Sequence, residues 1–435
     1  MSITVTLKRS IKGHLRTRFV KNIFLLMSGT VLAQLITVAA TPILGRVFSP
    51  EAFGIYSVFN GIVGIIVVAA SLQYNVAIVL PKHDEDAACI LVLSLTLTVI
   101  TCLVTALVFS VGGIWLLTTL HAAALISWWW CIPIDLLLTG VYQSFTAWLT
   151  RRKYFETSSL SLIIRSISLN LTQLASGAIA AGPLGLISGM CAADLIGSMV
   201  AAQPFIKRDY FRFKHAITIT RVRGMAREYI EFPAFSTPQG LLNAISQNAP
   251  LLLLAFYFDA KVAGLYAVSF RLLQLPVQLF VRSSKQVLYQ KACELHNSGA
   301  DTYAFFRKTT LGLIAVGIIP FMTIVFFAPS IFSFFLGPKW LVAGQYARWM
   351  AMWSAIGFIN TPAMILAQVY RKQRTLLIYD TALLCSRALA LVVGGLYHDA
   401  LLAIILYSIV GLIFNAGIIL WMWQLLKRAT DSVIS

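Results

Sequence analysis

Nine charged side chains lie inside stretches of this sequence that are otherwise apolar, and they are the residues best suited to chemistry. The acids are Asp135, Asp194 and Asp380, and the cations are Arg165, Arg271, Arg282, Lys285, Arg348 and Arg387. A charge in apolar surroundings needs a partner of opposite sign or a water-filled cavity. Because the cations outnumber the acids two to one, complete pairing would leave net positive charge. These residues therefore predict a hydrated lumen that attracts anions.

Residues 271–285 form a polar stripe when they are placed on a helix. The stripe consists of Arg271, Gln274, Gln278, Arg282 and Lys285, at steps of 3, 4, 4 and 3 residues. These steps keep all five side chains on one face, over about 21 Å. Three cations on one face repel one another unless an anion or water separates them, so the stripe predicts a wet helix face.

Arg165 and Arg387 occupy matching places, because each follows a basic cluster, at 151–153 and at 371–374. Guanidinium groups bind phosphate oxygens through pairs of parallel hydrogen bonds. Two such groups facing each other across a pseudo-twofold axis would suit a diphosphate. The alternative is that the arginines pair with the three acids. Arg348 lies nearer the end of its segment and is a candidate for the rim of the lumen.

Four other segments carry milder polar stripes at helical spacing. The stripes are Thr30, Gln34, Thr37 and Thr41; Asp135, Thr139, Tyr142 and Thr146; Ser158, Ser161, Arg165, Ser168 and Thr172; and Ser236, Gln239, Asn243, Ser246 and Pro250. They predict several helices that turn a polar face inward. Hydroxyl stripes are also ordinary helix-packing surfaces, and this alternative stays open for the first, second and fourth stripes.

The elements that position these residues follow from the composition. Hydrophobic residues make up 59% of the chain, charged residues make up 11%, and the mean hydropathy is +0.82. Soluble proteins carry about 25% charged residues, so this is an all-α polytopic membrane protein. Twelve segments are long enough to cross roughly 30 Å of hydrocarbon as helices. They are 20–45, 52–80, 87–112, 122–148, 157–180, 183–206, 232–257, 262–291, 306–328, 340–367, 375–396 and 399–426.

A pattern that recurs 210 residues apart divides the chain into two copies of one unit. The segment Phe48 to Val58 matches Phe258 to Val268, and Gly-Ile-Tyr at 54–56 becomes Gly-Leu-Tyr at 264–266. Six segments per copy return the chain to its starting side. This predicts two six-helix bundles related by a parallel repeat, which is typical of transporters. The predicted parts are an N-terminal bundle at 1–206, a basic linker at 207–231 and a C-terminal bundle at 232–435.

The 34 lysines and arginines are distributed unevenly between the two sides of the predicted helices. One side, which holds both termini, carries 25 of them in tails and loops, and the other side carries 3. The positive-inside rule therefore places both termini in the cytoplasm. The net charge of +18 becomes a signal of topology, and we predict no nucleic-acid partner. Aromatic and basic residues alternate in the linker, which suits a helix on anionic lipid headgroups.

Several kinds of chemistry lack the motif that they need. The chain has no Gly-Lys-Ser or Gly-Lys-Thr, so it has no P-loop for an ATPase of its own. No outside loop is long enough to form the domain that a polymerase or glycosyltransferase would use. The six cysteines show no Cys-x-x-Cys spacing and indicate neither a zinc site nor a disulfide framework. We expect a transporter that is not an enzyme and that uses no cofactor or metal.

Three runs in the first ninety residues resemble a known family. They are Pro42 to Phe59, Leu72 to Lys82 and the acidic Asp84-Glu85-Asp86. They look like the O-antigen and polysaccharide flippases of the multidrug/oligosaccharidyl-lipid/polysaccharide exporter superfamily. The resemblance implies a bacterial inner-membrane protein with two six-helix bundles around a cationic cavity. It implies that undecaprenyl-pyrophosphate-linked oligosaccharide, such as an O-antigen repeat unit of lipopolysaccharide, is turned from the cytoplasmic to the periplasmic leaflet.

The resemblance and the charges together give a hypothesis about the site. Arg165, Arg271 and Arg387 hold the pyrophosphate, Arg282 and Lys285 draw it in, and Gln278 and Arg348 line the path. Asp135, Asp194 and Asp380 are candidates for coupling to an ion gradient. Members of the family often have Arg and Glu where this chain has Gln73 and Asn75, so one expected charge pair is missing.

The same reasoning names partners and competing functions. The implied partners are the lipid-linked oligosaccharide, membrane lipids, and the polymerase and chain-length regulator of polysaccharide synthesis. One alternative is a cation-coupled multidrug exporter of the same superfamily, whose cationic substrates would call for an acidic lumen. Another is a lipid II-type flippase, although such proteins commonly have more than twelve spans.

Overall fold

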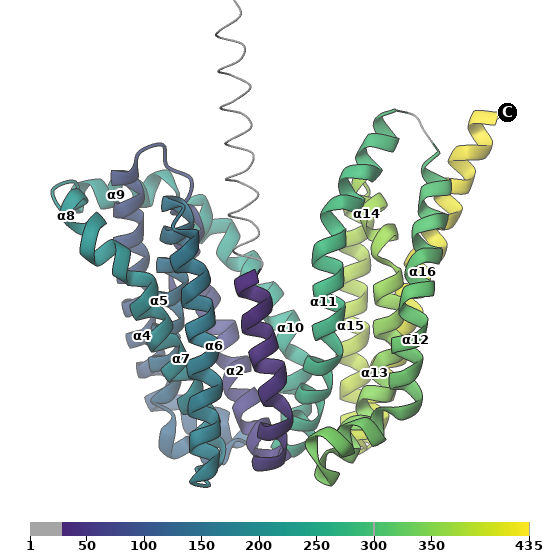
Figure 1. Cartoon of the computed structure of the whole chain (residues 1–435), viewed down its shortest axis with the longest axis horizontal. Helices are drawn as coiled ribbons and strands as arrows, with labels where there is room; N and C mark the ends of the chain where they lie inside the picture. Colours follow the sequence, from purple (N-terminus) through teal and green to yellow (C-terminus); the bar gives the residue numbers. More distant parts are fainter. Residues whose placement is uncertain (1–27, 299–300, 435) are drawn as a thin grey trace, which may run out of the picture. The chain divides into compact units, whose positions relative to one another are not determined.

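The computed structural model describes residues 28–298 and 301–434, and over these residues the protein contains helices and no strand (Figure 1). The basic N-terminal tail and the start of the first predicted span lie outside the described residues. So do the side chains of Gln278 and Arg282. The protein is therefore all-α, as its composition predicts.

Long helices alternate with the short helices and turns that connect them. The long helices are Ser28–Val47, α2 Pro50–Ala70, α4 Asp84–Thr119, α5 Cys131–Arg152, α6 Phe155–Ala178, α7 Gly182–Pro204, α10 Thr237–Tyr257, α11 Ala260–Asn297, α12 Thr302–Leu336, α13 Leu341–Ile359, α15 Gln373–Leu396 and α16 Ala400–Ile434. The short ones are α3 Tyr74–Ala77, α8 Tyr210–Phe213, α9 Ile219–Glu228 and α14 Thr361–Val369. Two 3-10 turns, Ala123–Trp128 and Pro338–Trp340, and two π-helical turns, Phe205–Asp209 and Phe232–Ser236, complete the set.

Eight stretches of the described chain are long and apolar enough to cross a membrane, so this is a multi-pass membrane protein. Four other predicted spans fall on α5, α6, α10 and α11, which are helical but less apolar. These are the helices on which most of the predicted polar stripes lie. Polar side chains lower the mean hydropathy of a helix, which is why these four fall short. The count of twelve spans stays a prediction.

The described chain divides into two compact units. Unit 1 contains the described residues up to Phe48 together with Phe59–Asn248, and unit 2 contains Ser49–Val58 together with the described residues from Ala249 onward. In unit 1, α6 packs along α7, and α5 packs against both α7 and α4. In unit 2, α12 packs along α13, and α15 packs along α16. These units are defined by which helices pack together, whereas the predicted parts are defined by repeated sequence. The predicted boundaries at 206 and 232 therefore stay a prediction.

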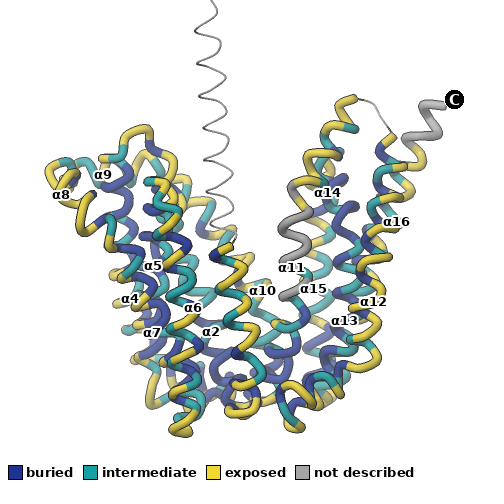
Figure 2. Tube along the Cα trace, viewed as in Figure 1, coloured by how far each residue is buried: buried dark blue, intermediate teal, exposed yellow. Residues whose placement is uncertain are grey.

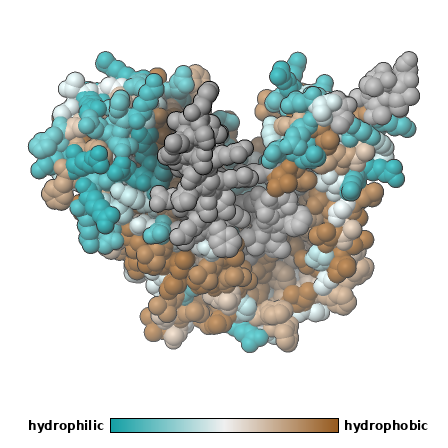
Figure 3. All heavy atoms as spheres, turned by 45° about the horizontal axis from the view of Figure 1, so that its top comes forward, coloured by the Kyte–Doolittle hydropathy of each residue, from teal (hydrophilic) through white to brown (hydrophobic). Residues whose placement is uncertain are grey.

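Each unit has its own core, and its remaining apolar surface is turned outward. In unit 1, Trp148 is fully buried and donates its indole N–H to Asp209 at 2.9 Å. Figure 2 shows buried and exposed residues alternating along the same helices. On α4, for example, Leu103, Leu107 and Val111 are 64%, 67% and 85% exposed, and their spacing forms a stripe suited to lipid. In Figure 3 hydrophobic residues cover much of the visible surface, and hydrophilic ones gather at its upper ends.

Within unit 2 the two copies of the repeated pattern touch at their glycines. A Cβ atom on Gly54 would overlap the backbone carbonyl of Ala260, and one on Gly264 would overlap the carbonyl oxygen of Pro50. The start of α2 and the start of α11 therefore cross with backbone against backbone. Only glycine permits such an approach, which explains why the glycine of the pattern stands in both copies.

We predict that Gly54→Ala destabilises the protein by about 1 to 3 kcal/mol, because the added methyl group overpacks the helix crossing. Gly312→Ala is the matched control, since a Cβ there meets no atom within 4 Å. That control should be neutral or stabilising by roughly 0.5–1 kcal/mol, as alanine is the better helix former. Thermal unfolding of the purified variants measures both changes, and equal midpoints for the two variants would contradict the crossing.

Candidate functional site

The first buried charge centre lies in unit 1, where α5, α6 and α7 meet. Arg165 on α6 forms an ion pair with Asp194 on α7, and the hydroxyl of Thr139 on α5 donates to the other Asp194 oxygen at 2.7 Å. The Arg165 guanidinium also lies 5.1 Å from the ring centre of Tyr142. Asp194 is fully buried, and the Arg165 side chain is 31% exposed. Arg165 is thus held by a carboxylate, which is the alternative that the sequence left open.

Asp135 lies one helical turn before Thr139 on α5 and has a different environment. Asp135 is 0% exposed, and neither of its carboxyl oxygens has a hydrogen-bond partner among the described residues by strict geometry. The Cys191 thiol of α7, a weak donor, lies beside this carboxyl group. A buried carboxylate without partners is costly, so this is an unusual place for an ionised group.

The second centre lies in unit 2 and is built on Arg387 of α15. The guanidinium stands 4.3 Å from the ring centre of Trp353 on α13 and 4.5 Å from that of Tyr407 on α16. The two rings contact each other edge to face, with centroids 6.1 Å apart. The Nε and Nη2 atoms of Arg387 are buried and have no hydrogen-bond partner, and the Trp353 indole N–H also lacks one. No carboxylate of the described residues lies within ion-pair distance of Arg387.

The two centres share one design with different chemistry. In unit 1, a Cβ on Gly197 of α7 would touch Arg165 and Tyr142. In unit 2, a Cβ on Gly411 of α16 would touch Arg387 and Trp353. Each centre therefore places an arginine over an aromatic ring and against a glycine of the next helix. The difference is charge, because the centre in unit 1 contains two carboxyl groups and the centre in unit 2 contains none.

The other predicted site residues are more exposed. Arg271 and Lys285 on α11 are exposed, whereas Arg348 on α13 is half-buried and donates to the carbonyl of Phe326 at 3.3 Å. Asp380 on α15 is exposed, unlike the other two acids. The side chains of Gln278 and Arg282 are not among those that the structure describes.

Part of the predicted polar striping is used for packing within unit 1. Ser166 on α6 donates to the carbonyl of Ala33 at 2.7 Å, and its hydroxyl lies 3.1 Å from that of Thr37. Asn170, one turn further on, also donates to the Thr37 hydroxyl at 3.3 Å. Here the hydroxyl stripe of helix Ser28–Val47 faces α6, which is the packing alternative.

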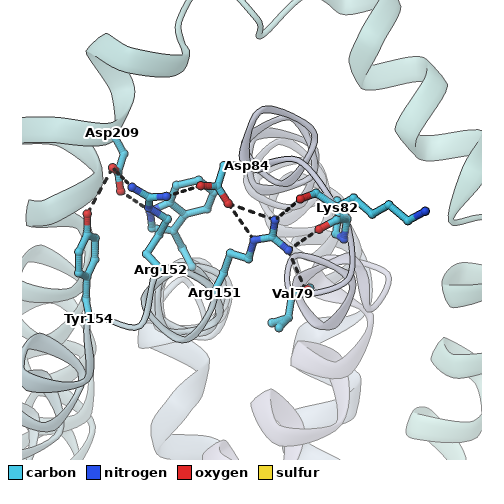
Figure 4. Close-up of polar contacts among 9 residues, drawn as sticks. Val79, Lys82, Asp84, Arg151, Arg152, Tyr154 and Asp209 are labelled. Carbon is cyan, nitrogen blue, oxygen red and sulfur yellow. Dashed lines mark hydrogen bonds and ion pairs between the residues drawn. The ribbon is translucent and has the colours of Figure 1, made fainter. Parts of the chain in front are cut away.

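A surface network ties together one end of unit 1 and explains the acidic run at 84–86. Asp84, at the start of α4, pairs with both Arg151 and Arg152 at the end of α5, and Arg152 also reaches Asp209 at 3.4 Å (Figure 4). Arg151 further donates to the carbonyls of residues 79, 81 and 82, which fixes the loop before α4 (Figure 4). This basic cluster is therefore structural.

Arg221 of the linker helix α9 completes the network. It donates to Glu85 at 2.7 Å and to Asp86 at 2.8 Å. The hydrogen bond to Glu85, reinforced by Asp86, raises the pKa of Arg221 above its usual value. The linker is thus anchored to α4 by charge, and its exposed Phe211 and Ile219 remain on the surface.

Comparison with known proteins identifies the family. The family model described as "Polysaccharide biosynthesis protein" matches residues 43–345, which is more than half of the chain. The chain belongs to this family. Among curated proteins, none matches the sequence.

Solved structures show that this polysaccharide biosynthesis protein shares its fold with transporters. An inward-facing multidrug resistance MATE transporter of the MOP superfamily is 15% identical with a TM-score of 0.66, and covers 93% of this chain and 99% of its own. The lipid II flippase MurJ, in an inward closed conformation, is 16% identical with a TM-score of 0.66, over 92% of this chain and 87% of its own. A MOP-superfamily transporter from Pyrococcus furiosus is 13% identical with a TM-score of 0.51, over 94% and 95%. These likenesses establish the fold.

Sequence reasoning found both arginines but missed the residues that distinguish their surroundings. Trp353 and Tyr407 were not among the predicted site residues, although they form the walls around Arg387. A signal was present, because Trp353 lies in the tenth predicted segment, the counterpart of the fourth segment, which contains Tyr142. The identity of the acid that reaches Arg165 depends on how α6 and α7 rotate against each other, and residue spacing does not contain that information.

We predict that Asp194→Asn in this polysaccharide biosynthesis protein lowers the free energy of unfolding by about 2 to 3 kcal/mol. The substitution leaves the Arg165 guanidinium without its counter-charge, and partial exposure keeps the cost at the lower end for buried pairs. Thermal unfolding measures the change, with Glu156→Gln on the exposed first turn of α6 as control. Adding Arg165→Gln should recover part of the loss, since the pair is then removed as a unit. Strictly additive effects would show that the two residues do not interact.

Proposed function

We propose that this protein is a flippase that moves undecaprenyl-pyrophosphate-linked oligosaccharide across the bacterial inner membrane. Membership of a polysaccharide biosynthesis family and the fold of MOP-superfamily transporters support a membrane flippase. The observation that carries the choice of an anionic substrate is the state of Arg387. Its charge is buried in part, has no carboxylate, and keeps two nitrogen atoms without partners.

The surroundings of Arg387 suit a phosphate group. The faces of Trp353 and Tyr407 stabilise the guanidinium without using its N–H donors, and the buried Nε and Nη2 atoms are left without a hydrogen-bond partner. Trp353 adds an indole N–H, and the buried hydroxyls of Ser354 and Ser408, one residue further along α13 and α16, also have no partner. A set of donors without acceptors favours an anion rich in oxygen. A cationic drug would find no counter-charge here.

The exposed cations of α11 extend this site in the proposal. Arg271 and Lys285 would attract the pyrophosphate, and Arg348 would line the path near the opposite end. Arg165 is held by Asp194, so we assign it to the substrate only in a state in which that pair opens. Polar stripes would hydrate the glycan while the polyprenyl tail stays in lipid.

The same proposal includes an orientation, which follows from the charges, and a direction of transport, which follows from the resemblance to polysaccharide flippases. The side with 25 basic residues, including the linker and the Arg151 cluster, lies in the cytoplasm with both termini. Substrate would enter from the cytoplasmic leaflet and leave into the periplasmic leaflet. A polymerase and a chain-length regulator would then act on the translocated repeat unit.

We predict that Arg387→Ala slows translocation roughly 10- to 100-fold, because hydrogen bonds to charged groups contribute about 1.5–3 kcal/mol. Arg387→Lys should give an intermediate rate, since it keeps the charge and loses the planar fork. The measurement is movement of labelled undecaprenyl-pyrophosphate oligosaccharide in proteoliposomes.

Arg374→Ala is the matched control for this experiment, because it removes an exposed arginine from the first turn of the same helix. It should transport at the native rate. A native rate for Arg387→Ala would refute the anion site. If correctly inserted native protein moved cationic drugs and no lipid-linked oligosaccharide, the function would be that of a multidrug exporter.

A further inference from the structure

The contrast between the two arginine centres raises the question of what balances the charges in unit 1. That centre contains one guanidinium, Arg165, and two fully buried carboxyl groups, Asp135 and Asp194. If both carboxyl groups were ionised, a net negative charge would lie in an apolar helix interface. Buried charge without compensation is strongly disfavoured, so the centre as it stands requires one further positive charge.

The geometry indicates which of the two carboxyl groups carries the added proton. Asp194 is engaged on both oxygens, by Arg165 on one and by the Thr139 hydroxyl on the other, and is therefore stabilised as a carboxylate. Asp135 has no partner on either oxygen among the described residues and has no exposed surface. The hydrogen bonds from Arg165 and Thr139 favour ionised Asp194, whereas Asp135 has only the weakly donating Cys191 thiol beside it.

The titratable groups around Asp135 are consistent with a bound proton. From α7 it faces Cys191 and Asp194, from α6 Arg165, and on its own helix Cys131. From α4 the nearby thiol is that of Cys102, which donates to the carbonyl of Pro133 at 3.2 Å. No group of three or more potential metal ligands occurs in the described chain. A metal ion would need several oxygen ligands, whereas a proton needs one.

We infer that Asp135 is a proton-binding site of unit 1, protonated in the arrangement seen here and deprotonated when the interface between α5 and α7 opens to water. The proton comes from solvent and returns to solvent, so no other reactant is required. Its use in transport rests on the proposed function: unit 1 would carry the proton and unit 2 the anion, on matching arginine scaffolds. Asp380, which is exposed, lacks the burial that this role needs.

Infrared difference spectroscopy on the purified full-length protein tests proton binding without any substrate. Between mildly acidic and mildly alkaline buffer, native protein should lose the C=O stretching band of a buried protonated carboxylic acid. Asp135→Asn, a near-isosteric neutral replacement, should lack the band. Glu156→Gln, which removes an exposed carboxyl group of α6, should keep it.

Two results would overturn the assignment of Asp135. One is a native protein with no titrating carboxylic acid band, and the other is an unchanged band in Asp135→Asn. Should Asp135→Asn fail to fold, native protein labelled with carbon-13 at its aspartate carboxyl groups tests whether an aspartate gives rise to the band. Its band must shift if an aspartate holds the proton, and an unshifted band would exclude Asp135.

Transport provides a separate readout for the use of the proton. A pH-sensitive dye inside proteoliposomes should report proton movement when substrate is added to native protein and to Glu156→Gln, and none with Asp135→Asn. Substrate movement without proton movement in native protein would refute the coupling role. Failure of substrate movement altogether would instead count against the proposed function, while the infrared band still decides whether Asp135 binds a proton.

Discussion

The cost of placing a charge among apolar helices is the constraint on which the rest of this structure depends. It explains why Asp194 takes both Arg165 and the Thr139 hydroxyl, and why the guanidinium of Arg387 stands between two aromatic rings. The residues that satisfy this constraint are also those on which the proposed function rests.

The two centres share one scaffold and differ in charge. Both hold an arginine against an aromatic ring, and a glycine of the following helix, Gly197 or Gly411, gives it room. In unit 1 the carboxyl group of Asp194 pairs with the arginine, so Arg165 has its counter-charge within the protein. In unit 2 no carboxyl group does so, and two nitrogen atoms of Arg387 have no hydrogen-bond partner. The chemical difference is therefore one of acids present or absent.

The sequence predicted much of this, and its failures have physical causes. Hydropathy and periodicity located the helical segments and their polar faces, because both depend on local residue order. The matching positions of Arg165 and Arg387 were also visible. The pairing of Arg165 with Asp194 was one of two open readings, since helix rotation decides it. The Arg151 cluster was seen as a basic patch, yet its role in holding Asp84 and the preceding loop needed the three-dimensional arrangement.

The glycine crossing in unit 2 connects the repeat to mechanics. Gly54 and Gly264 bring the starts of α2 and α11 together through backbone atoms. This contact is close, and it is made by backbone atoms with no ion pair between Gly54 and Gly264. The surface network around Asp84 and Arg221 is the opposite, because several charge-assisted hydrogen bonds hold α4, α5 and α9 as one body. The protein thus uses two kinds of close contact, backbone packing at the glycines of unit 2 and charge-assisted hydrogen bonds in unit 1.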